Sequence, residues 1–178
     1  MPAARPKLDD DEVLKAACSL VMTDLEREFP TVFPGRRERF IAEIFAAVNG
    51  SKVDDGYRIA KVLERDFGWM PDTGMAVTLH TFAGHAQTAL RQAILRWVEE
   101  AGVKPQLKHG DRIWLPASLV LVKEWEGSRV ASQIVNVDEK MAEYTVVALS
   151  ALPVVVGTQA SCLPFEVVEG AATAIPLT

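Results

Sequence analysis

The period of the hydrophobic pattern changes once along this chain, near the segment KPQLKHG at residues 104–110. Before it, apolar residues recur at the three- and four-residue spacing of amphipathic helices. After it, they form short β-branched runs separated by glycine, proline or charged turns. Because helices and strands need different periods, the two sides of this segment cannot fold alike. The sequence therefore predicts an α+β fold in which a helical part precedes a β part.

Residues 1–105 are predicted to form an N-terminal bundle of about five helices. The clearest helix lies in residues 85–102, where the apolar positions follow the i, i+3, i+4, i+7 spacing. Another lies within DDGYRIAKVLERDFG, where Asp54 or Asp55 is a candidate N-cap and Gly68 a candidate C-terminal stop. Packed on their apolar faces, these segments would make a small bundle.

Residues 106–178 are predicted to form a small antiparallel β-barrel with an apolar C-terminal tail. The candidate strands are GDRIWLP, SLVLVKEW, RVASQIVNVD, EYTVVAL, PVVVG and PFEVV. Closure into a barrel is the usual way for such short strands to avoid exposed edges. The boundary between the helical and β domains is expected at residues 103–109. The tail, which includes Ile175 and Leu177, is expected to dock on the chain itself or on a second copy.

Asp138, Glu139, Glu143 and Tyr144 lie close together in the β part, which would suit either an acid/base cluster or a polar turn. The flanking segments read as strands, so residues 138–143 become the loop of a hairpin. Carboxylates are common in such loops because they solvate the turn. A structural turn is therefore the favoured interpretation.

A family resemblance supports the β assignment. The segment GDRIWLP, the run over residues 131–146 and the segment PFEVVE resemble the strands of SH3-like small barrels of the Tudor and KOW class. The resemblance covers about residues 108–169. It implies a binding module more than an enzyme, because such barrels often hold a peptide, a modified side chain or a nucleic acid with aromatic residues at one rim. It points to Trp114, Trp125 and Tyr144 as barrel-rim binding residues.

Three arginines crowd the first turn of a predicted helix in the segment GRRER. Arg36, Arg37 and Arg39 lie where the helix dipole disfavours cations by some 0.3–1 kcal/mol each. Glu26 and Glu28, just before this segment, are candidate ion-pair partners at the surface. The alternative is an anionic partner that is held by the guanidinium groups and the free amides of the helix end. Pairing with the glutamates is favoured, and an anion or partner site at the arginines stays open.

Composition restricts the partners and the compartment. The chain has 19 Lys and Arg against 24 Asp and Glu, a formal net charge of −5, which repels polyanions such as nucleic acid. Nucleic-acid binding would need a local basic patch. The N-terminal residues MPAARPKLDDDE lack the apolar core of a secretory signal, and no run is apolar enough for a membrane span. Because only two isolated cysteines are present, a cytoplasmic location is expected.

No metal site or cofactor is predicted. His80 and His85 are five residues apart, about 500° along a helix, and so do not share a face. His109 adds no metal-binding spacing, and the common nucleotide, hydrolase and zinc-protease motifs do not occur. Cys18 falls on an apolar helical stripe and is expected in the core, and Cys162 has no nucleophile signature either.

The leading hypothesis is a non-catalytic protein-interaction or assembly component that acts through its surfaces, with a protein partner or a second copy and without a membrane. The alternative is a nucleic-acid-associated regulator that uses the arginine cluster and the barrel rim. A third reading is an enzyme whose site is assembled from scattered residues. Salt-dependent binding of nucleic acid would favour the second reading, and a titratable group with a perturbed pKa in a pocket would favour the third.

Overall fold

The computed structural model describes residues 4–33, 35–51, 55–120, 128–149 and 160–174. The chain divides into two compact units, Met1–Ile94 and Leu95–Thr178, which we call the helical unit and the sheet unit. No helix in the described ranges combines the length and the apolar character that a membrane span requires.

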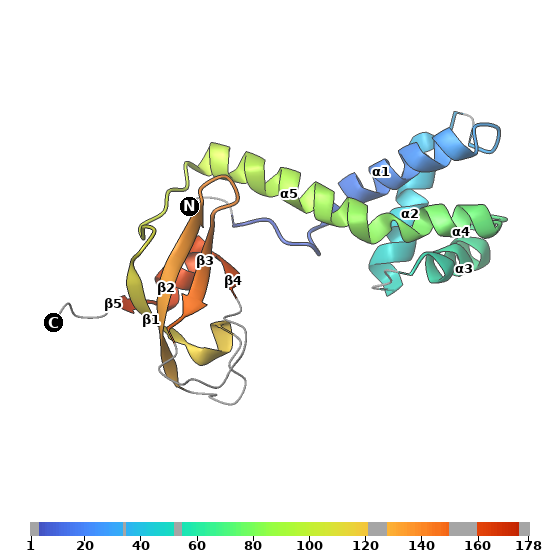
Figure 1. The fold of residues 1–178 in the computed structure, drawn as a ribbon. Coiled ribbons are helices and arrows are strands. Elements are labelled where there is room, and N and C mark those ends of the chain that lie inside the picture. The colour runs from blue at the N-terminus through green and yellow to red at the C-terminus, as the bar shows by residue number, and fades with distance from the viewer. Residues whose placement is uncertain (1–3, 34, 52–54, 121–127, 150–159, 175–178) are drawn as a thin grey trace. The chain divides into compact units, whose positions relative to one another are not determined.

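The first part of the chain folds into five helices, the number expected from the sequence (Figure 1). They are α1 (Asp11–Glu28), α2 (Arg37–Ser51), α3 (Gly56–Phe67), α4 (Thr73–His80) and α5 (Phe82–Ala101). Helix α5 is continuous across the division between residues 94 and 95. Its last turns therefore belong to the sheet unit.

Each of these five helices contributes apolar residues to the core of the helical unit. Cys18, as the sequence predicted, is fully buried on the α1 stripe. Burial of each large aliphatic side chain contributes about 1.5–3 kcal/mol, so this core is the main source of stability for the unit. The largest fully buried members are Met22, Leu25, Ile44, Ile59, Leu63 and Leu79.

The ends of α3 and α4 are capped as their sequences indicate. The Asp55 carboxylate accepts a hydrogen bond from the Tyr57 amide at 3.0 Å, and Asp72 accepts one from the Met75 amide at 2.8 Å. Gly68 ends α3 in the left-handed region, with φ of 70°. The predicted Asp55 cap and Gly68 stop are thus confirmed, and the turn between the two helices is fixed at both ends.

Gly56 lies where the start of α3 crosses the end of α4. A methyl group at this position would overlap the Ala76 carbonyl oxygen and the His80 backbone nitrogen, and would lie 2.7 Å from the His80 Cα atom. Because all of these are backbone atoms, they cannot rotate away as a side chain would. Only glycine lets the two helices approach this closely.

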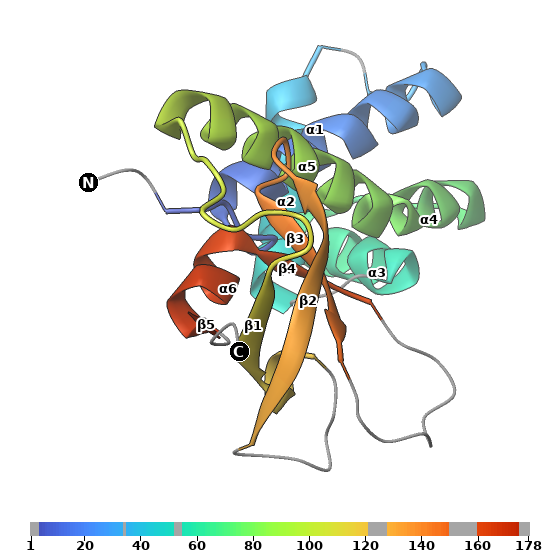
Figure 2. The same cartoon turned by 60° about the vertical axis from the view of Figure 1, so that its left-hand side comes forward.

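The sheet unit contains one five-stranded sheet with the order β4-β3-β2-β1-β5 (Figure 2). The strands are β1 (Arg112–Pro116), β2 (Arg129–Asp138), β3 (Glu143–Ala148), β4 (Ser161–Pro164) and β5 (Thr173–Ala174), and all pairs are antiparallel. A short 3-10 helix, η1 (Ala117–Leu119), follows β1. The predicted α+β class with an antiparallel sheet is confirmed. Among the described strands β4 and β5 form the two edges, so barrel closure stays a prediction.

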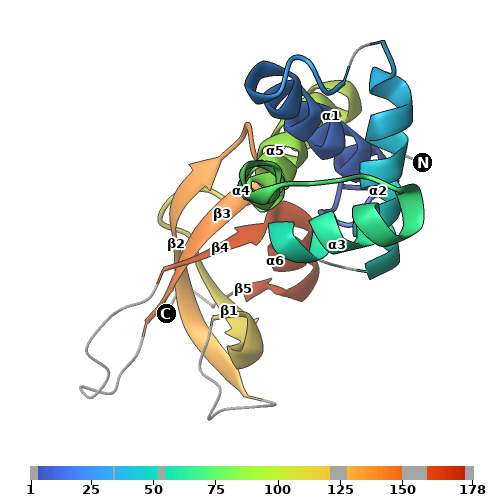
Figure 3. The same cartoon turned by 90° about the vertical axis from the view of Figure 1, so that its right-hand side faces the viewer.

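The segment PFEVV is a helix, which corrects the strand expected from its sequence. Helix α6 (Phe165–Ala171) follows Pro164 and covers one face of the sheet (Figure 3). Phe165 and Val168, three residues apart, are both buried, so the apolar residues follow a helical period. The expected strand PVVVG, most of SLVLVKEW and the tail residues Ile175 and Leu177 lie outside the described residues.

The β2–β3 hairpin accounts for the acidic interval in the sequence. The Asp138 carboxylate accepts hydrogen bonds from the Lys140 amide at 3.1 Å and from the Met141 amide at 3.0 Å. Glu143 is the first residue of β3 and pairs with Asp138 across the ladder. The interpretation of Asp138 as a turn residue is therefore confirmed.

The core of the sheet unit includes residues that precede the sheet. Trp97 and Val98 from the end of α5, with Val103 and Leu107 from the following segment, pack against it. Residues 103–109, where the sequence places the domain boundary, thus contribute to the sheet unit in the structure. The buried centre consists of Ile113, Leu115, Ala117, Val120, Val130, Ile134, Ala142, Tyr144, Val146, Phe165 and Val168.

Candidate functional site

Trp114 lies on the outer face of the sheet. Along β1 the side chains alternate, with Ile113 and Leu115 buried and Arg112 and Trp114 exposed. The Trp114 side of the strand is thus opposite to the face that packs the core. Trp114 retains 38% of its surface in solvent, a large exposed fraction for an indole on a sheet.

Two arginines and a glutamine surround Trp114 on this outer face. Arg112 is its neighbour two residues along β1, and Gln133 pairs with Arg112 on β2. Arg129 lies on β2, two residues before the cross-strand partner of Trp114. Its guanidinium group donates to the Trp114 carbonyl at 3.4 Å and to the Ala171 carbonyl, which holds it beside the tryptophan. We call Arg112, Trp114, Arg129 and Gln133 the Trp114 face.

Arg112 differs from Arg129 in its contacts. In the described part of the chain it has no ion pair or side-chain hydrogen bond, and it is exposed. The Trp114 face therefore combines an accessible indole, one fixed guanidinium and one guanidinium that can bind an incoming carboxylate or phosphate.

Of the other two predicted rim residues, Tyr144 does not lie on this face. Trp125 falls outside the described ranges. Tyr144 is fully buried and packs against Phe165, with ring centroids 4.3 Å apart. The alternation of β3 places Tyr144 and Val146 on the inner face, and this signal is present in the sequence.

The Tyr144 hydroxyl group holds the segment before β1. It donates to Glu169 Oε1 at 2.6 Å and accepts from the Leu107 amide at 2.9 Å, while the Gln106 amide donates to the same Glu169 oxygen at 2.8 Å. Burial, and then the hydrogen bond to Glu169, raise the pKa of Tyr144 to about 12. Tyr144 therefore acts as a structural tie.

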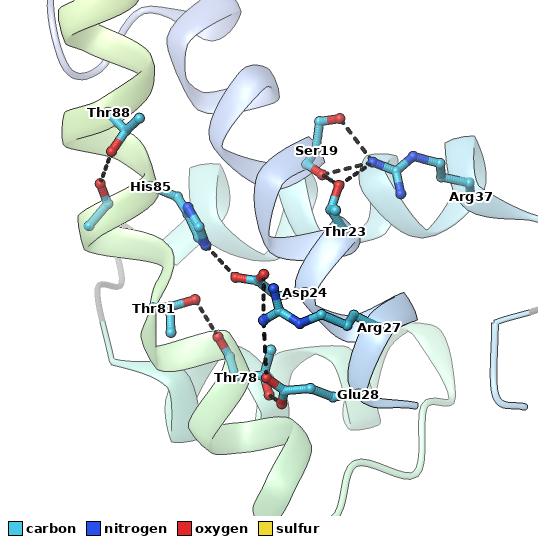
Figure 4. A network of polar contacts seen from close by, with 11 residues as sticks. Ser19, Thr23, Asp24, Arg27, Glu28, Arg37, Thr78, Thr81, His85 and Thr88 are labelled. Carbon is cyan, nitrogen blue, oxygen red and sulfur yellow. Dashed lines mark hydrogen bonds and ion pairs between the residues drawn. The ribbon is translucent and has the colours of Figure 1, made fainter. Parts of the chain in front are cut away.

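The arginine cluster is mostly paired. The Arg37 guanidinium forms an ion pair with Glu26 and donates to the Ser19 carbonyl at 2.9 Å and to the Thr23 hydroxyl at 2.8 Å (Figure 4 shows the contacts with Ser19 and Thr23). The pairing with Glu26 predicted from the sequence is confirmed. Glu28 instead lies 3.5 Å from Arg27 and accepts from the Thr78 hydroxyl at 2.5 Å.

Arg39 belongs to a contact that sequence reasoning missed. Its Nε lies 2.7 Å from Glu43 Oε1, and the other Glu43 oxygen accepts from the Trp69 indole at 2.6 Å. The Trp69 ring lies against Phe33 and Phe40, with centroids 5.4 and 5.2 Å away. No spacing in the sequence links Glu43 to Trp69, because the pair depends on how α2 meets the turn after α3.

Each histidine has a protein partner. His85 Nε2 lies 2.7 Å from Asp24 Oδ2 (Figure 4), His109 Nδ1 lies 2.8 Å from the Val135 carbonyl, and His80 Nδ1 lies 3.4 Å from the Gly56 amide. Within the described ranges, no three His, Cys, Asp or Glu side chains are grouped so that they could hold a metal ion.

The two cysteines are free thiols in different settings. Burial raises the pKa of the Cys18 thiol to about 12, which keeps it protonated, whereas Cys162 is exposed on β4.

Comparison of this chain with protein-family models, with curated protein sequences and with solved structures found no match. The surface chemistry described above is therefore the basis for a functional proposal.

Proposed function

We propose that this protein is a non-catalytic interaction component that binds a protein partner through the Trp114 face. The observation that carries the proposal is an exposed tryptophan flanked by the positions of Arg112 and Arg129 on the outer face of a sheet. Tryptophan and arginine are the residue types most enriched among the side chains that dominate binding energy at protein interfaces. A cytoplasmic location remains part of this proposal.

Preorganisation supports this assignment. The backbone of Trp114 is paired on both sides, with Ala131 on β2 and with Thr173 on β5. Arg129 is held by two carbonyl groups. A partner that covers this face would therefore order few side chains on binding, and the entropic cost of association would be low.

A nucleic-acid partner is the second candidate, because an exposed indole between guanidinium groups can also stack on a base and contact phosphate. Charge disfavours it. Residues 95–178 contain 7 Lys and Arg against 10 Asp and Glu, and residues 1–94 contain 12 against 14, so both units are acidic. Their fields would repel a polyanion. A protein segment with an apolar side chain and a carboxylate fits the same groups without this penalty.

The proposal can be tested with the full chain and a random peptide library displayed on phage. Selection on the wild type, with counter-selection on Trp114→Ala, should enrich peptides that carry acidic and apolar residues. Synthetic copies should bind the Trp114→Ala variant at least about tenfold more weakly, since removal of a central interface tryptophan commonly costs more than 1.4 kcal/mol.

Val167→Ala provides a matched control, because Val167 is similarly exposed, at 37%, and lies on α6, which covers the opposite face of the sheet. This variant should bind the selected peptides like the wild type. Equal enrichment on the wild type and on Trp114→Ala would refute the proposal. Binding of a single-stranded oligonucleotide that Trp114→Ala abolishes, without any selected peptide, would assign the face to nucleic acid instead.

A further inference from the structure

The outer face of the sheet extends beyond the Trp114 face. Tyr144 and Val146 of β3 pack in the core, so the side chains that alternate with them lie on the outer face. These are Glu143, Thr145 and Val147. The Thr145 hydroxyl lies 3.8 Å from the sulfur of Cys162, which is exposed on β4. The outer face therefore continues from β1 across the sheet to the β4 edge.

Cross-strand pairing arranges this face in rows. Trp114 pairs with Ala131, whose carbonyl accepts from the Leu149 amide, and these three residues form one row. Beyond the bulge in β2, Asp138 pairs with Glu143, so the two carboxylates share the outer face. We call Asp138 and Glu143 the acidic pair. Glu143 precedes Leu149 by six positions on the same strand, so the acidic pair lies about 20 Å from the Trp114 row.

The end of the face that contains Trp114 is positively charged. Arg129 donates to the carbonyls of Trp114 and Ala171, which leave its charge in place. Neither Arg112 nor Arg129 forms an ion pair in the described part of the sheet unit. Asp111, the carboxylate next to Arg112 in the sequence, accepts from the Lys108 amide in the turn before β1. Two guanidinium groups therefore flank the indole on this face.

The opposite end is negatively charged. Residues 138–143 contain three carboxylates, Asp138, Glu139 and Glu143, against one lysine, Lys140. The acidic pair places two like charges directly opposite each other in the ladder, an arrangement that costs stability. Cations that are brought against this pair therefore stabilise it. The outer face has one end that needs anions and one end that needs cations.

A second copy of the same face supplies both. When two copies meet face to face about a two-fold axis that runs across the strands, the strand direction of the second copy is reversed. With the axis between the rows of Gln133 and Asn136, the acidic pair of each copy lies opposite the Trp114 row of the other. Arg112 and Arg129 lie on either side of this row, each about 7 Å along the strands, within the reach of an arginine side chain. Near the axis, Val147 of one copy faces Thr145 of the other.

We infer that the partner of the Trp114 face is a second copy of this chain, which binds through its acidic pair in a symmetric dimer. This inference rests on the proposed function, because it names the partner of the same face. The same contact occurs twice, so the dimer is closed and grows no further. The outer face measures about 27 Å along the strands and about 14 Å across them, which corresponds to about 400–600 Å² per copy. Such an area belongs to the weak class of interfaces.

Sedimentation velocity of the full chain tests the inference. As the concentration rises to about 1 mM, the mean mass of the wild type should increase toward that of a dimer and not beyond it. Arg112→Glu places a carboxylate against the acidic pair, and Glu143→Arg places a cation against the Trp114 face. Each variant should raise the dissociation constant of the dimer at least about tenfold, since each substitution acts at two symmetric contacts. Trp114→Ala should weaken the dimer as well.

Arg96→Glu is the matched control, because it makes the same change of charge at an exposed position on α5. It should dimerise like the wild type. Restoration of the charges gives the decisive measurement. The double variant Arg112→Glu with Glu143→Arg has the wild-type net charge and recreates opposite charges across the contact. It should dimerise at least about fivefold more tightly than either single variant, and so should an equal mixture of the two single variants. Recovery would also show that the single variants are folded.

Several results would overturn the inference. Association that Arg112→Glu and Trp114→Ala leave intact would place the contact elsewhere, and charge restoration without recovery would exclude the pairing. A wild type that stays monomeric at about 1 mM would also overturn it. If a selected peptide still binds this monomer through Trp114, the proposed function stands with a different protein partner. If the monomer instead binds an oligonucleotide that Arg112→Glu releases, and no peptide is selected, both proposals fail in favour of nucleic acid.

Discussion

The hydroxyl group of Tyr144 connects three parts of the sheet unit at the scale of one residue. It joins β3, through its own backbone, to Glu169 on α6 and to the Leu107 amide before β1. Removal of the hydroxyl group would leave a part-buried amide and a carboxylate without this partner. Such losses cost about 1–3 kcal/mol.

Tyr144 also predicts a pH dependence of stability. Its pKa in the folded protein, about 12, is above the ordinary value of 10.0, so the neutral hydroxyl group is favoured by folding. Its contribution to the free energy of unfolding should be complete below pH 10 and should be lost as the pH rises from 10 toward 12. Urea unfolding of the wild type and of Tyr144→Phe should therefore give a difference in stability that shrinks over this range.

Tyr57→Phe is the matched control for this measurement, since Tyr57 is the other tyrosine of the chain and is 54% exposed. It should unfold like the wild type at every pH. A difference between the wild type and Tyr144→Phe that stays constant from pH 8 to pH 11 would contradict the structural role of the hydroxyl group.

The sequence contained more information about residue positions than about residue contacts. Alternation along the strands is enough to place Trp114 outside and Tyr144 inside, although the resemblance to SH3-like barrels groups both as aromatic rim residues. The contact of Glu43 with Trp69 could not be predicted, because it joins residues 26 positions apart on elements whose relative placement only the folded core determines.

At the scale of elements, Arg37 links α2 to α1. It contacts the Glu26 carboxylate, the Ser19 carbonyl and the Thr23 hydroxyl, all on α1. Arg37→Gln should lower the free energy of unfolding by roughly 1 kcal/mol, because the ion pair is partly exposed but is reinforced by two hydrogen bonds. Arg36→Gln should leave stability unchanged or slightly raised, since it removes a cation from the positive end of a helix dipole. Thermal unfolding of the two variants checks both expectations. Equal melting temperatures of Arg37→Gln and Arg36→Gln would refute the different roles of the two arginines.

The elements themselves were largely predictable, apart from α6. Long segments with a regular period, such as α5 and β2, can be assigned from the sequence because many positions agree with the same pattern. The segment PFEVV is short, and its apolar residues suit a strand as well as a helical turn. Packing determines that this segment forms a helix, since only a helix buries Phe165 and Val168 together against the sheet.

At the scale of the whole molecule, the division between the units predicts which fragments fold. A fragment of residues 95–178 retains Trp97 and Val98, which pack on the sheet core, whereas a fragment of residues 106–178 lacks them. The longer fragment should unfold cooperatively and show a near-UV circular dichroism spectrum. The shorter one should be a few kcal/mol less stable, because it loses Trp97, Val98 and Val103, which are partly buried and so contribute less each than the about 1.5–3 kcal/mol of a fully buried side chain. Equal stability of the two fragments would show that the end of α5 contributes nothing to the sheet unit.

The crossing at Gly56 also bears on ancestry. Natural selection can exchange most core residues for others of similar volume, but a position where any side chain would overlap the backbone of Ala76 and His80 admits one amino acid. Descendants of a common ancestor that still cross α3 over α4 in this way should therefore have kept glycine here. They should also have kept an acidic cap directly before it and a glycine twelve positions after it, as Asp55 and Gly68 stand in this chain. That pattern, Asp-Gly followed by a buried helical stripe and a second glycine, is a signature by which distant relatives can be recognised when their overall sequence identity is low.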